Sequence, residues 1–258
     1  MIRMKSVESA LDTAAPYIIS SRWLTAFTGA GVSAESGIPT FRGTDGIWNE
    51  YNPDVLEISY FRAHPKESWI VIRDLFYEKF RQAEPNPAHK ILAAWEKRGL
   101  LKQIITQNID DLHYRAGNRS IIEYHGNSRL VRCLQCGKTF PADSLDLSQL
   151  PPLCTICGGL LKPDFVFFGE SIPPEALSAS IQAMEKTDCL LVIGTTGEVY
   201  PAASLPRIAK KQGAFIIEVN PQPSAFTFSL VDTYIPLPAG EAFLRLEERI
   251  QATPIRCV

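Results

Sequence analysis

The sequence predicts an α/β protein in which a parallel sheet carries helices on both faces and a smaller unit is attached to it. Three observations support this fold class. Short apolar runs alternate with helical patterns along the chain, as at 101–106, 189–193 and 214–219, and this alternation is typical of parallel sheets. Small or polar residues follow several of these runs. Two Cys-x-x-Cys pairs interrupt the pattern near the middle and indicate a metal-binding unit.

The composition is that of an ordinary globular protein without a membrane span. The 258 residues are 45% hydrophobic and 21% charged, and the formal net charge is −2. This balance argues against a protein that binds nucleic acid by neutralising phosphates, so no direct nucleic-acid partner is expected. No apolar run approaches the ~20 residues of a membrane span, and Met1–Ser9 lacks a cleavable signal pattern. We therefore expect a cytoplasmic protein, monomeric by default, whose cysteines stay reduced.

The first predicted strand, at 23–27, leads into a glycine-rich turn. Residues Gly29–Ala34 fit the G-x-G-x-x-G/A pattern of Rossmann-like folds, in which glycines let the backbone approach a pyrophosphate at the start of a helix. Gly37–Pro39 ends that helix after about one turn, and Thr40–Gly43 follows as an irregular loop. Because glycine-rich turns after strands are common, this pattern alone leaves nucleotide binding open.

Helical regions flank this turn. Residues 6–20 predict a leading helix, and the aromatic-rich stretch 44–84 predicts a small helical insert. Large apolar residues of the insert are expected to form its core rather than a binding platform; they include Phe61, Trp69 and Phe76. A further helix begins at Asn86, an N-cap followed by Pro87, and ends before Gly99.

Small or polar residues follow four of the predicted strands. They lie at 28–31, 106–110, 194–196 and 219–220. In an open parallel sheet the carboxyl ends of the strands form the edge where ligands bind. Four such ends together favour a nucleotide site at this edge. The chain closes with a strand near Tyr234 and a helix that starts near Ala239.

The cysteine pairs predict a structural zinc site. Cys133-x-x-Cys136 and Cys154-x-x-Cys157 are separated by 17 residues, which matches the spacing of a four-cysteine zinc ribbon. Four thiolates saturate a tetrahedral ion and leave no position for water, so the metal is expected to support the fold. The alternative is four buried free cysteines. Cys189 lies within a predicted strand and is expected to fill the core.

The chain contains four histidines, at positions 64, 89, 113 and 125. His64 and His89 lie beside prolines at helix starts and are expected to be structural. His125 follows a predicted strand and precedes the cysteine pairs. Position alone favours a structural role for His125 as well, and only its combination with the other motifs favours catalysis.

Several strings of residues occur together in one order. They are Gly29–Gly43, Thr106–Asp110, His125–Gly126, the two cysteine pairs, Phe167–Glu170 and Gly194–Thr196. This set resembles the sirtuins of prokaryotic type, which are NAD-dependent protein lysine deacylases. The resemblance covers nearly the whole chain, from about Trp23 to Ile250. It reverses the interpretation of His125, which it implies to be a general base.

The resemblance implies a single catalytic region over residues 1–258. A Rossmann-like core would come from about 1–43, 86–126 and 163–258. The helical insert would span about 44–85 and the zinc-ribbon insert about 127–162. NAD and an acyl-lysine peptide would meet in the cleft between the core and the inserts.

The resemblance also implies the residues of the site. NAD would contact Gly29, Ala30, Gly31, Glu35, Thr40, Phe41, Arg42, Gln107, Asn108, Ile109, Asp110, Gly194, Thr195, Thr196, Asn220 and Ala239. The peptide, bound as an added strand, would contact Val166, Phe167, Phe168, Gly169, Gly197, Glu198 and Val199. His125 and Asn108 would be catalytic, and Asp110 would bind the carboxamide of nicotinamide.

The implied reaction transfers the acyl group of lysine to ADP-ribose. It would release nicotinamide, free lysine and O-acyl-ADP-ribose, with a base of near-neutral pKa activating a ribose hydroxyl. Two alternatives stay open: protein mono-ADP-ribosyl transfer and a non-catalytic NAD sensor. The joint presence of Asn108, Asp110 and His125 favours deacylation, because binding alone needs no base.

Two departures from the sirtuin pattern limit what the resemblance implies, and the acyl preference is a separate question. Thr40 stands where many members carry aspartate, and Gly197-Glu198 follows Gly194–Thr196 where a leucine is commoner. Sirtuins that prefer acidic acyl groups carry tyrosine and arginine three residues apart in the helical insert. Here Tyr77 is followed at that spacing by Phe80, and Arg81 falls one position late. Because a helix turns ~100° per residue, we expect the guanidinium to point away and acetyl to be preferred over succinyl.

Overall fold

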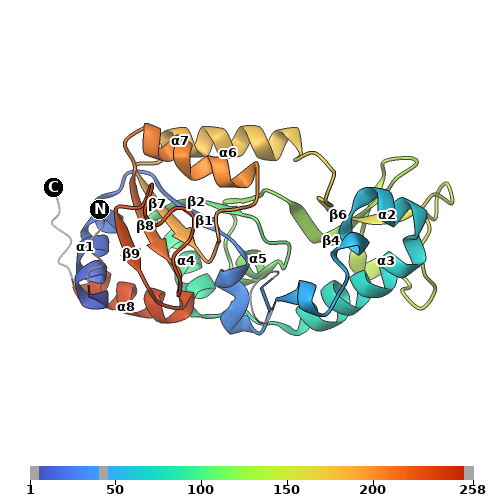
Figure 1. Ribbon diagram of the computed structural model, residues 1–258, viewed down its shortest axis with the longest axis horizontal. Helices are drawn as coiled ribbons and strands as arrows, with labels where there is room; N and C mark the ends of the chain where they lie inside the picture. The colour runs from blue at the N-terminus through green and yellow to red at the C-terminus, as the bar shows by residue number, and fades with distance from the viewer. Residues whose placement is uncertain (1–5, 41–45, 253–258) are drawn as a thin grey trace.

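The computed structural model describes residues 6–40 and 46–252. The long axis of the molecule runs from a parallel sheet flanked by helices to a smaller unit built on an antiparallel sheet (Figure 1). Element labels follow Figure 1, and η marks 3-10 helices and, in the case of η4, a π-helix.

The large sheet gathers the carboxyl ends of its parallel strands at one edge. Its strands are β1 (Leu24–Thr28), β2 (Leu101–Thr106), β3 (Ile121–Glu123), β7 (Cys189–Ile193), β8 (Phe215–Val219) and β9 (Thr233–Ile235). They lie in the order β3-β2-β1-β7-β8-β9. Thr28 lies opposite both Thr106 and Ile193, and Ile193 lies opposite Val219. The segments that follow β1, β2, β7 and β8 therefore meet, as the sequence predicted.

Helices α1 (Val7–Ser20), α4 (Pro87–Lys97) and α8 (Ala239–Ala252) cover one face of this sheet. The predicted cap of α4 is confirmed, because the Asn86 side chain accepts hydrogen bonds from the backbone N–H groups of Ala88 and His89. The same side chain donates to the Val32 carbonyl at 2.7 Å and so ties α4 to the turn after β1. The short helix α5 (Leu112–Ala116) packs beside α4.

The opposite face is covered by α6 (Pro174–Lys186), α7 (Leu205–Lys211) and the short η7 (Ala202–Ser204) (Figure 1). Strand β7 serves both faces because successive side chains of a strand point to opposite sides. Leu191 and Ile193 pack with α1, α4 and α8, whereas Leu190 and Val192 pack under α6 and α7. No helix within residues 6–40 and 46–252 is long and apolar enough to cross a membrane.

The helical insert has the aromatic core that the sequence predicted. Its elements are η2 (Ile47–Asn49), η3 (Pro53–Leu56), α2 (Ile58–Ala63), α3 (Pro65–Ile72), η4 (Arg73–Lys79) and η5 (Phe80–Gln82). Phe61 and Trp69 are fully buried and Phe76 is 4% exposed. The Trp69 indole donates to the Leu161 carbonyl at 2.9 Å, which joins the insert to the small sheet. The π-helical turn of η4 was not predicted.

The small sheet is antiparallel and carries the first cysteine. Strands β4 (Gly126–Cys133), β5 (Thr139–Pro141) and β6 (Leu161–Phe165) lie in the order β5-β4-β6, and η6 (Ala142–Ser144) follows β5. Val131 lies opposite Phe140 on one side and Pro163 on the other. Strand β4 begins directly after His125, so the small sheet starts at the edge of the large one.

Candidate functional site

A cavity of about 380 Å³ lies where the strand ends of the large sheet meet the end of β6 and the helical insert. This volume falls within the range of about 300–1,000 Å³ that is usual for ligand pockets. The predicted NAD-contacting residues in its lining are Gly29, Ala30, Gly31, Thr40, Gln107, Asn108, Ile109, Gly194, Thr195, Thr196 and Asn220. Predicted catalytic and peptide-binding residues that also line it are His125, Val166, Phe167, Phe168, Gly169 and Val199.

The turns after β1 and β7 pack backbone against backbone at the floor of this cavity. The Gly29 and Gly31 N–H groups donate to the carbonyls of Ile193 and Gly194 at 2.9 and 2.8 Å. A Cβ atom on Gly31 would lie 2.8 Å from Gly194 Cα, and Gly194 itself has a φ of 59°. Glycine is therefore required by this contact between the two turns, besides any close approach to a pyrophosphate.

The short helix predicted after the first turn is a 3-10 helix, η1 (Ala30–Ser36), and ends at Gly37. Glu35, on this helix, accepts a hydrogen bond from the backbone N–H of Gly240 at the start of α8. Ala239 is 4% exposed beside it. Glu35, Asp110 and Ala239 lie outside the cavity lining, and the predicted contacts of Phe41 and Arg42 fall outside the described residues.

A polar cluster holds the segment that follows β2. The Asn108 amide nitrogen lies 3.2 Å from the Gly29 carbonyl, 3.2 Å from Ser33 Oγ and 3.1 Å from Asp110 Oδ2. Ser33 donates to Asp110 Oδ2 at 2.6 Å, and the Leu112 N–H donates to Asp110 Oδ1 at 3.0 Å. Burial raises the pKa of Asp110, and these hydrogen bonds oppose the rise. Ser33 was missed because a serine in a small-residue turn has no distinctive spacing.

A second layer of polar residues lies buried behind this cluster. Thr28 Oγ1 donates to Thr106 Oγ1 at 2.9 Å and lies 3.0 Å from His113 Nε2. The rings of His113 and His89 are 4.7 Å apart, and both residues are almost fully buried. Burial lowers the pKa of His89 to about 4 and that of His113 well below its ordinary value, so both rings are neutral near pH 7. The structural interpretation of His89 agrees with this position.

His125 lies in the turn between β3 and β4 and lines the cavity. Its Nδ1 lies 3.0 Å from the Gln107 carbonyl oxygen, which can only accept, so Nδ1 carries the proton. In the neutral ring, Nε2 is therefore left with a free lone pair. Burial lowers the pKa of His125 below the ordinary value of 6.5, and the hydrogen bond to Gln107 partly offsets this effect. The imidazole is thus a neutral base near pH 7.

The segment after β6 forms the other wall of the cavity. Its backbone is anchored at two points: the Val166 N–H donates to the His125 carbonyl at 2.8 Å, and the Phe168 N–H donates to the Leu56 carbonyl at 2.8 Å. Lys162, 6% exposed, lies 3.0 Å from a Glu170 carboxylate oxygen that also accepts the Phe167 N–H at 2.8 Å. Sequence reasoning missed Lys162, whose partners are visible only in three dimensions.

Of the predicted peptide-binding residues at 197–199, only one lines the cavity. Val199 lines the cavity together with Tyr200, the residue at which the predicted peptide-binding segment ends. Gly197 has a φ of 73° and packs against Phe226, whose ring would lie 2.7 Å from a Cβ atom at that position. Gly197 and Glu198 lie outside the lining. Gly197 therefore shapes this segment through its backbone.

The four cysteines of the two pairs meet in one cluster. Their sulfur atoms all lie within 4.8 Å of one another, with Cys133 and Cys157 at 3.5 Å and Cys136 and Cys154 at 3.8 Å. A tetrahedral zinc ion with bonds of about 2.3 Å places its sulfur ligands about 3.8 Å apart. The donor set and its spacing therefore fit a structural zinc ion, as the sequence predicted. Cys189 is buried in β7, away from the cluster.

We predict that the purified protein contains about one zinc ion per chain. Cys133→Ser should remove this ion and unfold the small sheet, because a structural zinc ion contributes directly to folding stability. Metal analysis by mass spectrometry and circular dichroism measure both effects. Cys189→Ala is the matched control and should retain zinc. A metal-free Cys133→Ser protein that is fully folded would contradict this prediction.

Comparisons with known proteins agree with this geometry. A model of the Sir2 family matches residues 29–201. The chain is 45% identical to NAD-dependent protein deacylase 2 of Pyrobaculum aerophilum, over 92% of this chain and 94% of that protein. A solved Sir2 homolog–NAD complex is similar with a TM-score of 0.87 and 42% identity, covering 97% of this chain and 96% of that one.

A second solved structure, a Sir2–p53 peptide–NAD⁺ complex, is similar with a TM-score of 0.84 and 34% identity. The match covers 98% of this chain and 100% of that chain. Sequence, fold and site geometry therefore lead to one conclusion. The chain belongs to the Sir2 family.

Proposed function

We propose that this protein is an NAD-dependent protein lysine deacylase, which transfers an acyl group from lysine to ADP-ribose and releases nicotinamide. The observation that carries the proposal is the orientation of His125. Its Nδ1 is held by the Gln107 carbonyl, and the ring lines a cavity with the glycine turn on one side and the segment after β6 on the other. The name of the Pyrobaculum aerophilum relative supports the same activity.

The residues at the strand ends fit NAD. The cavity lining includes the backbone of Gly29–Gly31, Thr195 and Asn220, together with Asn108 and Ile109. When bound, NAD supplies an ADP-ribosyl group whose bond to nicotinamide can break. We propose that Asp110 binds the carboxamide of nicotinamide. The Asn108 amide nitrogen donates to Asp110 and holds it in place. Asn108, which was predicted to be catalytic, therefore acts in part as a positioning residue.

His125 is the proposed general base. Neutral Nε2 would accept a proton from a hydroxyl group of the ribose, while Nδ1 keeps its hydrogen bond to Gln107. A base is matched to this task when its pKa lies close to the working pH. Burial of His125 lowers its pKa, so the ring is neutral near pH 7 and can accept a proton.

The acyl-lysine peptide is proposed to enter between the segment after β6 and the segment around Val199. Both segments contribute to the cavity lining, and Phe168 leaves 49% of its surface exposed there. An extended peptide would bind there mainly through main-chain hydrogen bonds, a mode that tolerates many sequences. The p53 peptide in a similar solved complex supports a peptide substrate.

We further propose the division expected from the sequence, with a core from about 1–43, 86–126 and 163–258 and inserts at about 44–85 and 127–162. The two sheets and the helical insert support it. A monomer is proposed as the default, as expected from the sequence. A reducing compartment such as the cytoplasm suits the four clustered thiols.

Mass spectrometry of an acetyl-lysine peptide, incubated with and without NAD, tests the function. We expect loss of the acetyl mass only with NAD, an equimolar yield of O-acetyl-ADP-ribose, and a rate at least about 100-fold lower for His125→Ala because the base is lost. His64→Ala, which changes an exposed histidine of the insert, is the control and should retain the rate within about twofold.

The alternatives predict other outcomes of the same experiment. ADP-ribose added to protein without deacylation would indicate mono-ADP-ribosyl transfer. No turnover of NAD with any acyl chain would indicate a sensor. Either outcome would contradict the proposed deacylase.

The pH dependence tests the base more specifically. Deacylation requires neutral His125, so kcat/KM should rise with pH through the His125 pKa and then level off. Because burial lowers this pKa, the midpoint of the acidic limb should lie below 6.5. Rates measured across the acidic range with the acetyl-lysine peptide give this midpoint. A midpoint above 6.5 would contradict the assignment.

We propose that acetyl is preferred over succinyl. Arg81 pairs with Asp143 at 2.6 Å and Tyr77 stacks on Trp69, and neither Arg81 nor Tyr77 lines the cavity. Within residues 6–40 and 46–252 no arginine lines the cavity to pair with a succinyl carboxylate, so kcat/KM should be at least about tenfold higher for an acetyl-lysine peptide. Matched acetyl and succinyl peptides measure this ratio. A higher kcat/KM for succinyl would overturn the preference.

A further inference from the structure

Asp111 has an unusual backbone conformation in the segment that follows β2. Among the described residues it is the only non-glycine residue with positive φ, at 67°. Residues with a Cβ atom rarely adopt this conformation, although aspartate tolerates it better than most. Asp111 directly follows Asn108–Asp110, the segment proposed to receive nicotinamide. Whatever holds Asp111 therefore also limits where Asp110 can lie.

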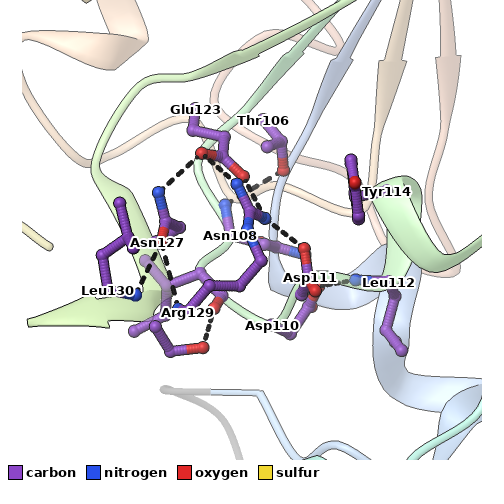
Figure 2. Close-up of polar contacts among 12 residues, drawn as sticks. Thr106, Asn108, Asp110, Asp111, Leu112, Tyr114, Glu123, Asn127, Arg129 and Leu130 are labelled. Carbon is purple, nitrogen blue, oxygen red and sulfur yellow. Dashed lines mark hydrogen bonds and ion pairs between the residues drawn. The ribbon is translucent and has the colours of Figure 1, made fainter. Parts of the chain in front are cut away.

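Arg129, in β4, is the residue that holds Asp111 (Figure 2). Its guanidinium forms an ion pair with Asp111 and a forked pair with Glu123, whose two oxygens lie 2.7 and 3.0 Å from the two terminal nitrogens. It also lies 5.0 Å from the centre of the Tyr114 ring. A planar guanidinium can satisfy both carboxylates at once, which a lysine ammonium cannot do with the same geometry.

The partners of Arg129 are themselves fixed. The Asn127 side chain donates to Glu123 at 2.8 Å and accepts the Arg129 backbone N–H at 3.0 Å. Ser128 donates through its hydroxyl to the Ile109 carbonyl at 2.7 Å. The Arg129 side chain is 34% exposed and the Asp111 and Glu123 side chains are 16% and 22% exposed, so water screens these pairs only in part.

This cluster joins three segments of the site. Asp111 belongs to the segment after β2, Glu123 ends β3 two residues before His125, and Arg129 lies in β4. In the sheet, Glu123 lies opposite Thr106, the residue from which the Asn108–Asp110 segment departs. One guanidinium thus fixes the distance between the segment that carries Asp110 and the turn that carries His125.

We propose that Arg129 is a positioning residue for the nicotinamide half of NAD, acting through Asp111 on Ile109 and Asp110. This role rests on the proposed function, and it concerns the binding of the nicotinamide half of NAD. The adenosine half would contact the turns after β1, β7 and β8, which Arg129 does not touch. Loss of the Arg129 pairs should therefore weaken binding of NAD and spare ADP-ribose, which lacks nicotinamide.

Calorimetric titration of the full-length protein with NAD and with ADP-ribose tests this proposal. For Arg129→Met we expect about tenfold weaker NAD binding and ADP-ribose binding within about twofold of the wild type. Arg129→Lys should recover part of the NAD affinity, because it restores the charge without the fork. Arg132→Met is the matched control, since Arg132 lies on the same strand and forms a forked pair with Asp164 at 2.8 and 3.1 Å.

A second variant keeps the proposal testable if Arg129→Met fails to fold. Asp111→Gly accepts the positive φ but removes the ion pair, and it should show the same selective loss of NAD affinity. Equal loss of NAD and ADP-ribose affinity, or no loss of either, would overturn the proposal. Wild-type protein that binds NAD but does not deacylate a peptide would refute the proposed function alone, because the two titrations still decide the role of Arg129.

Discussion

The arrangement of the site depends on the contact between the turns after β1 and β7. Hydrogen bonds from Gly29 and Gly31 to Ile193 and Gly194 join these turns without any side chain between them. A Cβ atom on Gly194 would lie 2.3 Å from the Val32 backbone nitrogen, so even alanine would force the turns apart. Because β1 and β7 are neighbours in a parallel sheet, the contact also sets the floor of the cavity. The glycines are therefore required for packing of the two turns, whether or not a ligand is bound.

The other walls of the cavity are fixed by polar contacts between distant segments. Ser33 and Asn108 hold Asp110 from the side of the sheet, and Arg129 holds Asp111 from the side of β4. His125 takes its orientation from the Gln107 carbonyl. Neutral His89 and His113 fill the space behind without adding charge. The Gln107 carbonyl, just after β2, therefore determines that Nε2 of His125 is the nitrogen without a proton.

Much of this fold could be predicted from the sequence because its signals are local. The strands at 101–106 and 189–193, the Asn86 cap and the cysteine spacing agree with the structure. Ser33 and Arg129 could not be predicted, because their roles arise when segments separated in the chain meet; Ser33 and Asp110, for example, are 77 residues apart. The 3-10 geometry of η1 and the π-turn of η4 likewise reflect packing that local propensity does not encode. Individual NAD and peptide contacts remain predictions.

The tautomer of His125 tests the central claim most directly. Nitrogen NMR of histidine-labelled protein can assign His125 among the four histidines by comparison with His125→Ala. The structure predicts that Nδ1 carries the proton at neutral pH, that Nε2 carries none, and that the ring titrates below 6.5. A proton on Nε2 of the neutral ring would contradict the claim, because Nε2, the proposed proton acceptor, would then be a donor and could not act as the base.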